Sequence, residues 1–330
     1  MRAVLLFSSI AIGFLTMSAI PDRQINNNNV VKETYIHKYG MPVPANDWSE
    51  RGQHGQVVTT LKNGVVITKT FEAGMLDGPT TFTFPHSSAI EKTQIFVKGN
   101  LIKEVTHYRS GPPREEVQHI GRNAKSITSW YENGTPKSHE EFDNEDQLVK
   151  GEYYNSAHTL EAQVDNKNGI RIIRNQYGLV QYKDTIENGD MVVRTTFHHN
   201  GYPKEITPYK DHIVEGVRQT FLPDGEPSTI ELWADGRQQG ITTLFQNGEK
   251  FAEVPYSNGQ KNGLERRYKD GKFVVEDISW YNGLQEGPRT VYADDVASTE
   301  WYFEGNQVPK VNYQLRVHAS NRPYVQHFPL

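Results

Sequence analysis

The chain has 330 residues, a net charge of −5 and no cysteine, so it contains no disulfides. Its 35 basic and 40 acidic residues are mixed along the sequence without a basic tract, which argues against a nucleic acid as the main partner. A mean hydropathy of −0.68 combined with 11% aromatic residues excludes a disordered chain and indicates a folded structure with much exposed surface.

The first fifty residues differ in composition from the rest. Residues 1–20 resemble a targeting segment, because Arg2 precedes an uncharged, apolar stretch from Ala3 to Met17. We therefore expect a bacterial protein that is exported, either periplasmic or secreted. The alternative is an uncleaved N-terminal anchor, which would be the only contact with a membrane. Residues 21–50 are rich in asparagine and proline and are expected to form a polar linker.

Residues 51–310 are expected to form an array of about eleven repeats with a period of about 23 residues. The clearest repeats open with a glycine and carry an aromatic residue five positions later. These pairs are Gly216 with Phe221, Gly240 with Phe245, Gly263 with Tyr268, and Gly287 with Tyr292. Weaker openings precede them at Gly55, Gly78, Leu101, Ala124, Gly151, Gly169 and Val192.

The local sequence of each repeat is that of a β-hairpin. Asn-Gly and Asp-Gly pairs separate short segments such as 216–221, which alternate with the period of a strand. No long helical period follows residue 50. The sequence therefore predicts an all-β fold, an elongated and twisted antiparallel sheet of tandem hairpins with roughly twenty strands. Residues 311–330 are expected to form a C-terminal tail or a cap over the last strand edge.

The second half of each repeat ends on an aromatic residue that precedes another turn. These residues are Trp233, Tyr256, Trp280 and Trp301. We expect the first-strand aromatic residues to stack as an apolar spine. If the second series lies on the opposite, solvated face, it would form a binding strip for a peptide, a glycan or another protein. If instead the second series lies on the same face as the first, it is part of the apolar spine.

The pattern G-x4-[FY]-x2-[DNK]-G, followed by an aromatic residue and a second turn, resembles the MORN repeat. It is most similar to the bacterial variant found in YwqK-like putative antitoxins, over most of residues 55–305. The resemblance implies a hairpin-repeat sheet with a binding or scaffolding role and no catalytic residues. An antitoxin role is usually intracellular and fits poorly with an exported chain. The Trp-Tyr doublets at 130–131 and 280–281 also resemble the choline-binding cell-wall repeat.

The sequence contains none of the common nucleotide-binding, serine-hydrolase or zinc-protease motifs. The acidic cluster 143–146 lacks the glycine and the later glutamate of a calcium-binding loop. We therefore expect no enzyme activity and no cofactor or metal. The function expected first is a protein-interaction scaffold that acts through its sheet surface. The alternatives are a carbohydrate- or envelope-binding module that uses the aromatic strip, and an antitoxin-like protein that binds a partner.

Overall fold

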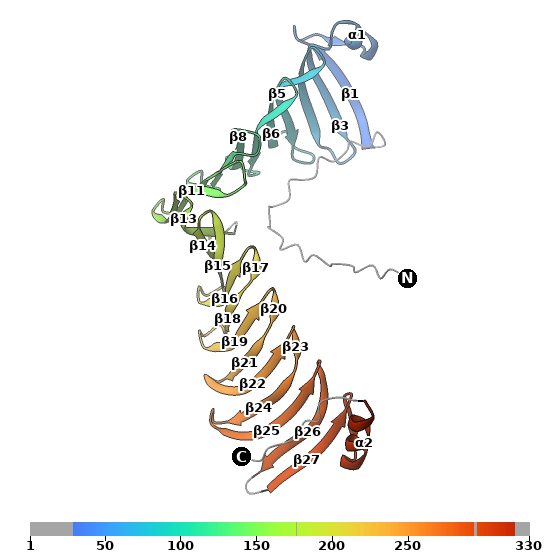
Figure 1. Cartoon of the computed structure of the whole chain (residues 1–330). Coiled ribbons are helices and arrows are strands. Elements are labelled where there is room, and N and C mark those ends of the chain that lie inside the picture. The colour runs from blue at the N-terminus through green and yellow to red at the C-terminus, as the bar shows by residue number, and fades with distance from the viewer. Residues whose placement is uncertain (1–28, 176, 294–295, 321–330) are drawn as a thin grey trace. The chain divides into compact units, whose positions relative to one another are not determined.

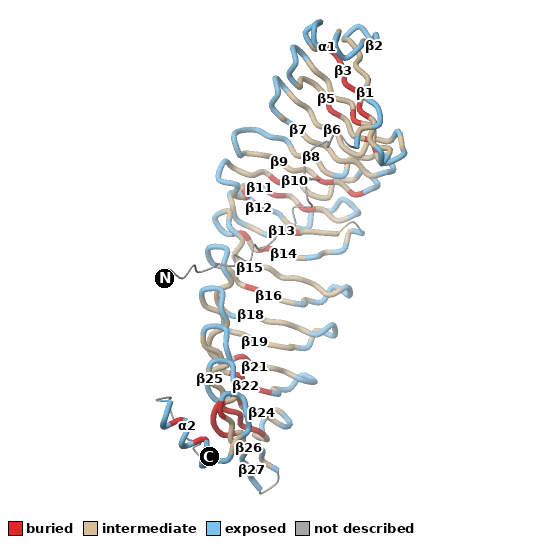
Figure 2. The backbone as a smooth tube through the Cα atoms, turned by 90° about the vertical axis from the view of Figure 1, so that its right-hand side faces the viewer, coloured by how far each residue is buried: buried red, intermediate tan, exposed pale blue. Residues whose placement is uncertain are grey.

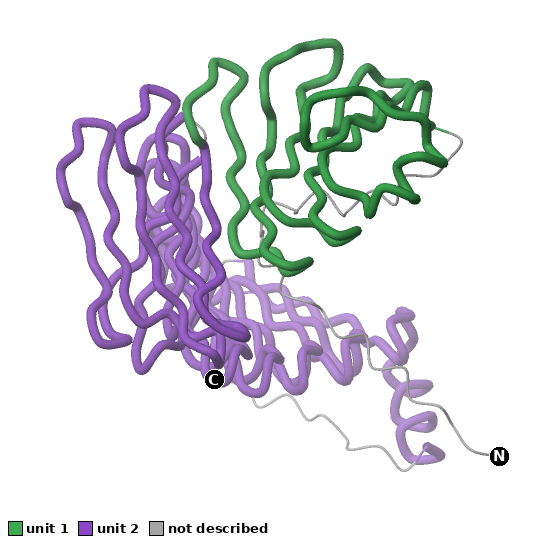
Figure 3. The backbone as a smooth tube through the Cα atoms, turned by 90° about the horizontal axis from the view of Figure 1, so that it is seen from above, with its two compact units in different colours: residues 1–113 green, residues 114–330 purple. Residues whose placement is uncertain are grey.

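The computed structural model describes residues 29–175, 177–293 and 296–320, so the expected targeting segment and the last ten residues of the expected cap lie outside the described residues. This described part is all-β, with 28 strands and two helices. The prediction of an antiparallel sheet of tandem hairpins is confirmed. Neither helix is long and apolar enough to cross a membrane. The chain divides into two compact units, residues 1–113 and 114–330 (Figure 3).

Unit 1 is an open antiparallel sheet with the strand order β2-β1-β3-β4-β5-β6-β7 and one short helix. Its elements are β1 (Val30–His37), β2 (Pro42–Val43), α1 (Ala45–Glu50), β3 (Gly55–Leu61), β4 (Val66–Glu72), β5 (Met75–Thr83), β6 (Ile90–Val97) and β7 (Asn100–His107). Residues 30–50 are therefore structured and do not form the expected linker. The reason is that β1 pairs along the whole of β3, and Trp48 of α1 is buried against Tyr35 and Phe71, with ring centroids 5.7 and 6.2 Å away.

Unit 2 is an antiparallel sheet in which strands pair in chain order (Figure 1). Its elements are β8 (Pro113–His119), β9 (Lys125–Trp130), β10 (Pro136–Phe142), β11 (Leu148–Tyr154), β12 (Leu160–Asp165), β13 (Asn168–Arg174), β14 (Val180–Glu187), β15 (Asp190–Phe197), β16 (Pro203–Lys210), β17 (Ile213–Val214), β18 (Gly216–Phe221), β19 (Pro227–Ala234), β20 (Arg237–Gln238), β21 (Gly240–Gln246), β22 (Glu249–Ser257), β23 (Gln260–Lys261), β24 (Gly263–Lys269), β25 (Phe273–Tyr281), β26 (Leu284–Ala293), β27 (Val296–Phe303), β28 (Asn306–Val308) and α2 (Lys310–Ser320).

In three consecutive repeats of unit 2, the strand is interrupted one residue before the opening glycine. The short strands β17, β20 and β23 end there, and β18, β21 and β24 begin at the glycine. Tyr256 pairs with Lys261 before the third interruption, whereas Glu253 pairs with Arg266 after it. Tyr256 and Glu253 are three residues apart on β22, whereas their partners Lys261 and Arg266 are five residues apart, so the second strand carries two extra residues. Because the difference is two residues, each side chain keeps its face of the sheet despite the bulge.

Successive repeats are also joined through their turns. The amide N–H of the glycine in each second turn donates to a carbonyl of the preceding repeat. The pairs are Gly236 to Val214 at 3.1 Å, Gly259 to Gln238 at 2.9 Å, Gly283 to Lys261 at 2.8 Å and Gly305 to Gln285 at 2.9 Å. At the interruption, the Glu215 carboxylate also accepts the Asp235 N–H at 2.7 Å. Each repeat is thus held by its neighbour, as in other linear repeat proteins.

The sheet buries few side chains completely, and the densest group of buried positions in unit 2 lies on β25 and β26 (Figure 2). An apolar cluster forms where α2 packs on β27, separate from the one that Leu148, Tyr153, Val164, Ile172 and Ile186 form on β11 to β14. Tyr313 and Val317, one helical turn apart, are buried there with Phe303, and the rings of Tyr313 and Trp301 lie 5.0 Å apart. Residues 310–320, which include the first part of the expected tail or cap, therefore form a helix. The helix forms because this apolar pair at i and i+4 finds aromatic residues to cover.

Candidate binding faces of the sheet

The pairing register between β16 and β27 assigns every residue to one of two faces. Directly opposed residues of an antiparallel pair project to the same side, and neighbours along a strand project to opposite sides. The polar face is the one that carries Arg218 and Glu231, which oppose each other across β18 and β19. The aliphatic face is the one that carries Val217 and Leu232, which form the adjacent opposed pair.

The two predicted aromatic series lie on opposite faces. The first-strand residues Phe221, Phe245, Tyr268 and Tyr292 lie on the aliphatic face. Three second-strand residues lie on the polar face, each opposite an opening glycine: Trp233 at Gly216, Tyr256 at Gly240 and Trp280 at Gly263.

Trp301 is separated from the other three residues of the expected strip. It opposes Pro288 on the aliphatic face, and its neighbour Tyr302 opposes Gly287 on the polar face. The fourth member of the aromatic column is therefore Tyr302. The choice of Trp301 was therefore wrong, although the spacing already favoured Tyr302: Tyr302 precedes its turn glycine by three residues, as Trp233, Tyr256 and Trp280 do, whereas Trp301 precedes it by four.

Two positively charged side chains of the sheet pack against the tryptophan rings of the polar face. The Arg218 guanidinium lies 5.7 Å from the centre of the Trp233 ring, and the ammonium of Lys261 lies 4.4 Å from that of Trp280. The indole N–H of Trp233 donates to Glu231 at 2.8 Å. Both rings are half-buried. The strip is therefore engaged in internal cation–π contacts rather than fully open to solvent.

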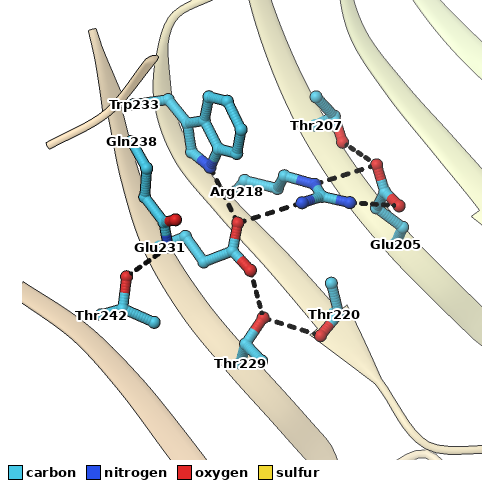
Figure 4. Close-up of polar contacts among 9 residues, drawn as sticks. All are labelled: Glu205, Thr207, Arg218, Thr220, Thr229, Glu231, Trp233, Gln238 and Thr242. Carbon is cyan, nitrogen blue, oxygen red and sulfur yellow. Dashed lines mark hydrogen bonds and ion pairs between the residues drawn. The ribbon is translucent and has the colours of Figure 1, made fainter. Parts of the chain in front are cut away.

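Arg218 is the centre of a polar network on this face (Figure 4). It donates to Glu205 at 2.8 Å and to Glu231 at 3.0 Å, so one guanidinium joins carboxylates from the strands on either side. The Thr207 hydroxyl donates a further hydrogen bond to Glu205 at 2.5 Å. Burial by itself raises the pKa of Glu205, but the hydrogen bonds from Arg218 and Thr207 outweigh it and hold the pKa below its usual value.

The same arrangement recurs along the polar face of unit 2. Arginines two positions after a repeat opening pair with acidic residues on other strands. These pairs are Arg171 with Glu140 at 2.7 Å, Arg194 with Asp184 at 2.7 Å, and Arg289 with Glu276 at 2.6 Å. The three carboxylates are buried, and an arginine satisfies each of them. The sequence signal was present, because Arg171, Arg194, Arg218 and Arg289 share one repeat position, but the acidic partners could not be assigned without the register.

The aliphatic face carries exposed apolar side chains at the residue that follows the opening glycine. Together with their opposed residues, they form the aliphatic row, which comprises Val217, Leu232, Ile241, Pro255 and Leu264. Val217, Leu232, Ile241 and Leu264 are 48%, 42%, 53% and 39% exposed. The row crosses β18, β19, β21, β22 and β24, which corresponds to about 20 Å at about 4.8 Å per strand. The sequence analysis did not single out this row, although the glycine-plus-one position marks it.

The next question is whether acidic and histidine side chains gather at one place. Nowhere in the described ranges do three or more His, Asp or Glu side chains cluster in a way that could hold a metal ion. Asp143 of the acidic cluster pairs with Lys167 at 2.6 Å and accepts the backbone N–H groups of Glu145 and Gln147 at 3.0 Å each. The hydrogen bond from Lys167 lowers the pKa of Asp143. This cluster therefore organises a turn of the chain.

No protein-family model matches this chain, and no curated protein sequence matches it. The likeness to MORN repeats accordingly stays a prediction drawn from the repeat pattern.

Proposed function

We propose that the protein is a non-enzymatic scaffold of MORN-type repeats that binds a protein partner on the aliphatic face of unit 2. The observation that supports this function is the aliphatic row, in which four branched aliphatic side chains on β18, β19, β21 and β24 are 39% to 53% exposed. Contiguous apolar surface of this kind typically marks an interaction site. Export of the scaffold from a bacterial cell is part of the proposal and rests on the character of residues 1–20.

The polar face supports the scaffold over a carbohydrate-binding module. Binding of a sugar by stacking needs an open aromatic ring face. The rings of Trp233 and Trp280 are half-buried and already lie against Arg218 and Lys261. The charged groups beside these rings, Arg218 and Lys261, are paired with carboxylates of the sheet, whereas four side chains of the aliphatic row are exposed.

A capture experiment with matched variants tests this function. The affinity-tagged full chain serves as bait for envelope and culture-medium proteins of the producing cell, and captured proteins are quantified by mass spectrometry. The row variant is Leu232→Lys with Ile241→Lys. The control variant is Phe273→Lys with Val296→Lys, which adds the same charge at apolar residues that are 65% and 69% exposed outside the row.

The scaffold predicts a protein that the wild-type chain and the control variant capture and that the row variant loses. A third bait, Trp233→Ala with Trp280→Ala, tests the glycan alternative. Capture of a polysaccharide that only this third bait loses would overturn the scaffold and make the aromatic column the site. Circular dichroism of each variant verifies that the sheet is intact.

A further inference from the structure

In three repeats of unit 2, the second strand pairs with the first strand of the next repeat at a fixed position. The paired residues lie four and three positions before the aromatic residue of the polar face, which is Tyr209, Trp233 or Tyr256. In β19, Thr229 and Ile230 pair in this way with β21. The corresponding residues are Glu205 and Ile206 of β16, which pair with β18, and Ala252 and Glu253 of β22, which pair with β24.

Strand β27 has no such neighbour among the described residues. Tyr302 is its aromatic residue on the polar face, so Ser298 and Thr299 take the two paired positions. The short strand β28 pairs only with residues 301–303, just as β20 pairs only with residues 233–234 of β19. Residues 296–299 of β27 are exposed, and they are the free edge of the sheet. Figure 1 shows β27 at the end of unit 2.

Pro309 explains why the chain does not continue into another repeat at this point. It lies four residues after the turn glycine Gly305, where the preceding repeats have an opening glycine. Two of those glycines, Gly240 and Gly263, have φ values of +72° and +119°. The ring of proline fixes φ near −65°, so Pro309 cannot make the same turn into a new strand. The chain enters α2 at the next residue instead, and the position beside the free edge stays open.

The free edge presents backbone groups that can bind another strand. The two-residue turn 304–305 has positive φ at both residues, so Phe303 and Asn306 form the hydrogen-bonded pair that closes the hairpin. Every second residue before Phe303 therefore directs its N–H and C=O away from β26, and these residues are Trp301, Thr299 and Ala297. Pro288, which opposes Trp301 on β26 and has no N–H, is consistent with this alternation.

A groove of about 650 Å³ lies at this edge. It is lined by Thr299 and Glu300 of β27 and by Gln307 and Val308 of β28, among other residues. Charged residues and prolines usually protect sheet edges from pairing, and residues 296–299 contain neither. An exposed edge of this kind can accept an extended chain through main-chain hydrogen bonds.

The side chains of the free edge favour an uncharged strand. Where the residue four positions before the aromatic is acidic, an arginine of the next strand pairs with it. These pairs are Arg218 with Glu205 at 2.8 Å and Arg289 with Glu276 at 2.6 Å. Ser298 takes this position in β27 and offers no negative charge to an arginine. The closest precedent is β19, where the equivalent residues are uncharged and the uncharged strand β21 pairs with them.

We propose that the free edge of β27 binds an extended, uncharged segment of a partner protein as an additional antiparallel strand. The segment takes the position on β27 that β21 takes on β19, and it forms main-chain hydrogen bonds with Ala297 and Thr299. A second copy of the chain has matching strands in β18, β21 and β24, but each of these is paired on both sides in its own sheet. The site is separate from the aliphatic row, so it does not depend on the proposed function.

A synthetic peptide with the sequence of residues 239–248, which contains β21, tests this site on the full chain. In the chain, Thr243 lies opposite Ile230, the equivalent of Thr299, so the N–H of Thr243 in the bound peptide faces β27 and that of Thr242 faces away. N-methylation of the peptide at Thr243 should therefore weaken binding at least about tenfold, whereas N-methylation at Thr242 should leave it unchanged. Fluorescence anisotropy of the labelled peptides measures the dissociation constants.

Two variants of Thr299 locate the peptide on the free edge. Thr299→Pro removes the N–H that points out of the sheet, whereas Thr299→Val keeps it, and both lose the hydroxyl contact with Thr290 at 3.0 Å. Peptide affinity should fall at least about tenfold for Thr299→Pro and stay unchanged for Thr299→Val. Bound peptide should also slow hydrogen exchange at the amides of Ala297 and Thr299. The row variant, Leu232→Lys with Ile241→Lys, should bind the peptide as the wild-type chain does, so failure of this site and failure of the scaffold function are distinguishable.

Three results would overturn the proposal. The first is equal affinity of the two N-methylated peptides, and the second is the absence of binding at about millimolar peptide. The third is slow hydrogen exchange at Ala297 and Thr299 in the chain without peptide, because the edge would then already be covered. A doubled mass in light scattering would in that case assign the edge to a second copy, and a monomeric mass would assign it to another segment of the same chain.

Discussion

Tyr302 lies directly opposite Gly287 across β26 and β27, and its hydroxyl donates to Glu300 on the same strand at 3.0 Å. Trp280 likewise lies directly opposite Gly263, one repeat earlier. An aromatic ring opposite the opening glycine is thus a constant feature of these repeats. Trp301, one residue before Tyr302, lies on the other face and supports α2.

Replacing Trp301 with alanine should release α2 from the sheet. Loss of the ring contact with Tyr313 removes much of the apolar surface that the helix covers, with an expected local cost of about 2–4 kcal/mol. Hydrogen exchange in residues 310–320 should accelerate strongly, while β18 to β22 keep their protection. Tyr302→Phe is the control, because it removes only the hydroxyl that bonds Glu300. Unchanged exchange in α2 would show that Trp301 does not anchor it.

Replacing Arg218 with methionine should destabilise the middle of unit 2. The change leaves Glu205 and Glu231 without their shared cation. Breaking a buried ion pair costs about 3–5 kcal/mol, but Arg218 is 26% exposed, so we expect about 2 kcal/mol after solvent screening. Urea unfolding and hydrogen exchange of β16, β18 and β19 measure this loss. Adding Glu205→Gln and Glu231→Gln to Arg218→Met should restore part of the stability; a triple variant weaker than the single one would contradict the network.

The stability of unit 2 should depend on pH in the acidic range through Glu205. Its folded-state pKa is held below its usual value, so its contribution is fully present above the unfolded pKa of about 4.3. That contribution is lost as the pH falls through the lower, folded-state pKa. The wild-type chain should therefore exceed Glu205→Gln in urea midpoint at pH 7, and the difference should shrink below about pH 4. A difference that stays constant between pH 7 and pH 3 would exclude this origin.

Replacing Gly263 with alanine should cost about 1–3 kcal/mol. Its φ of +119° is a conformation that side chains rarely adopt, and an added Cβ would lie 3.1 Å from Cγ of Pro255. Gly259→Asn is the matched control in the adjoining turn. Its φ is +80°, an added Cβ there meets no atom within 4 Å, and asparagine tolerates this region well. Thermal unfolding of both variants should show a clear loss for Gly263→Ala and little change for Gly259→Asn.

The sequence by itself determined the period, the hairpins and the two aromatic series of this protein. These features follow from local physics, because Asn-Gly and Asp-Gly pairs favour tight turns and strand residues alternate with a period of two. The opening glycines Gly216, Gly240, Gly263 and Gly287 therefore mark strands in the structure as they do in the sequence. The helical fold of residues 310–320 was not predicted, since its short apolar pattern acquires meaning only against Trp301 and Phe303.

Only the tertiary structure decided which residues share a face and which charges pair. Arg171 and Glu140 are 31 positions apart, and Arg218 lies 13 positions from each of its two carboxylates. Such pairs depend on the register of several strands and on the bulge before each glycine, which a repeat pattern does not reveal. The same register placed Trp301 under α2 and left Val217, Leu232, Ile241 and Leu264 exposed. Side-chain period alone gives two faces, but the identity of the neighbours across strands decides which charged groups pair within the sheet and which apolar side chains stay exposed.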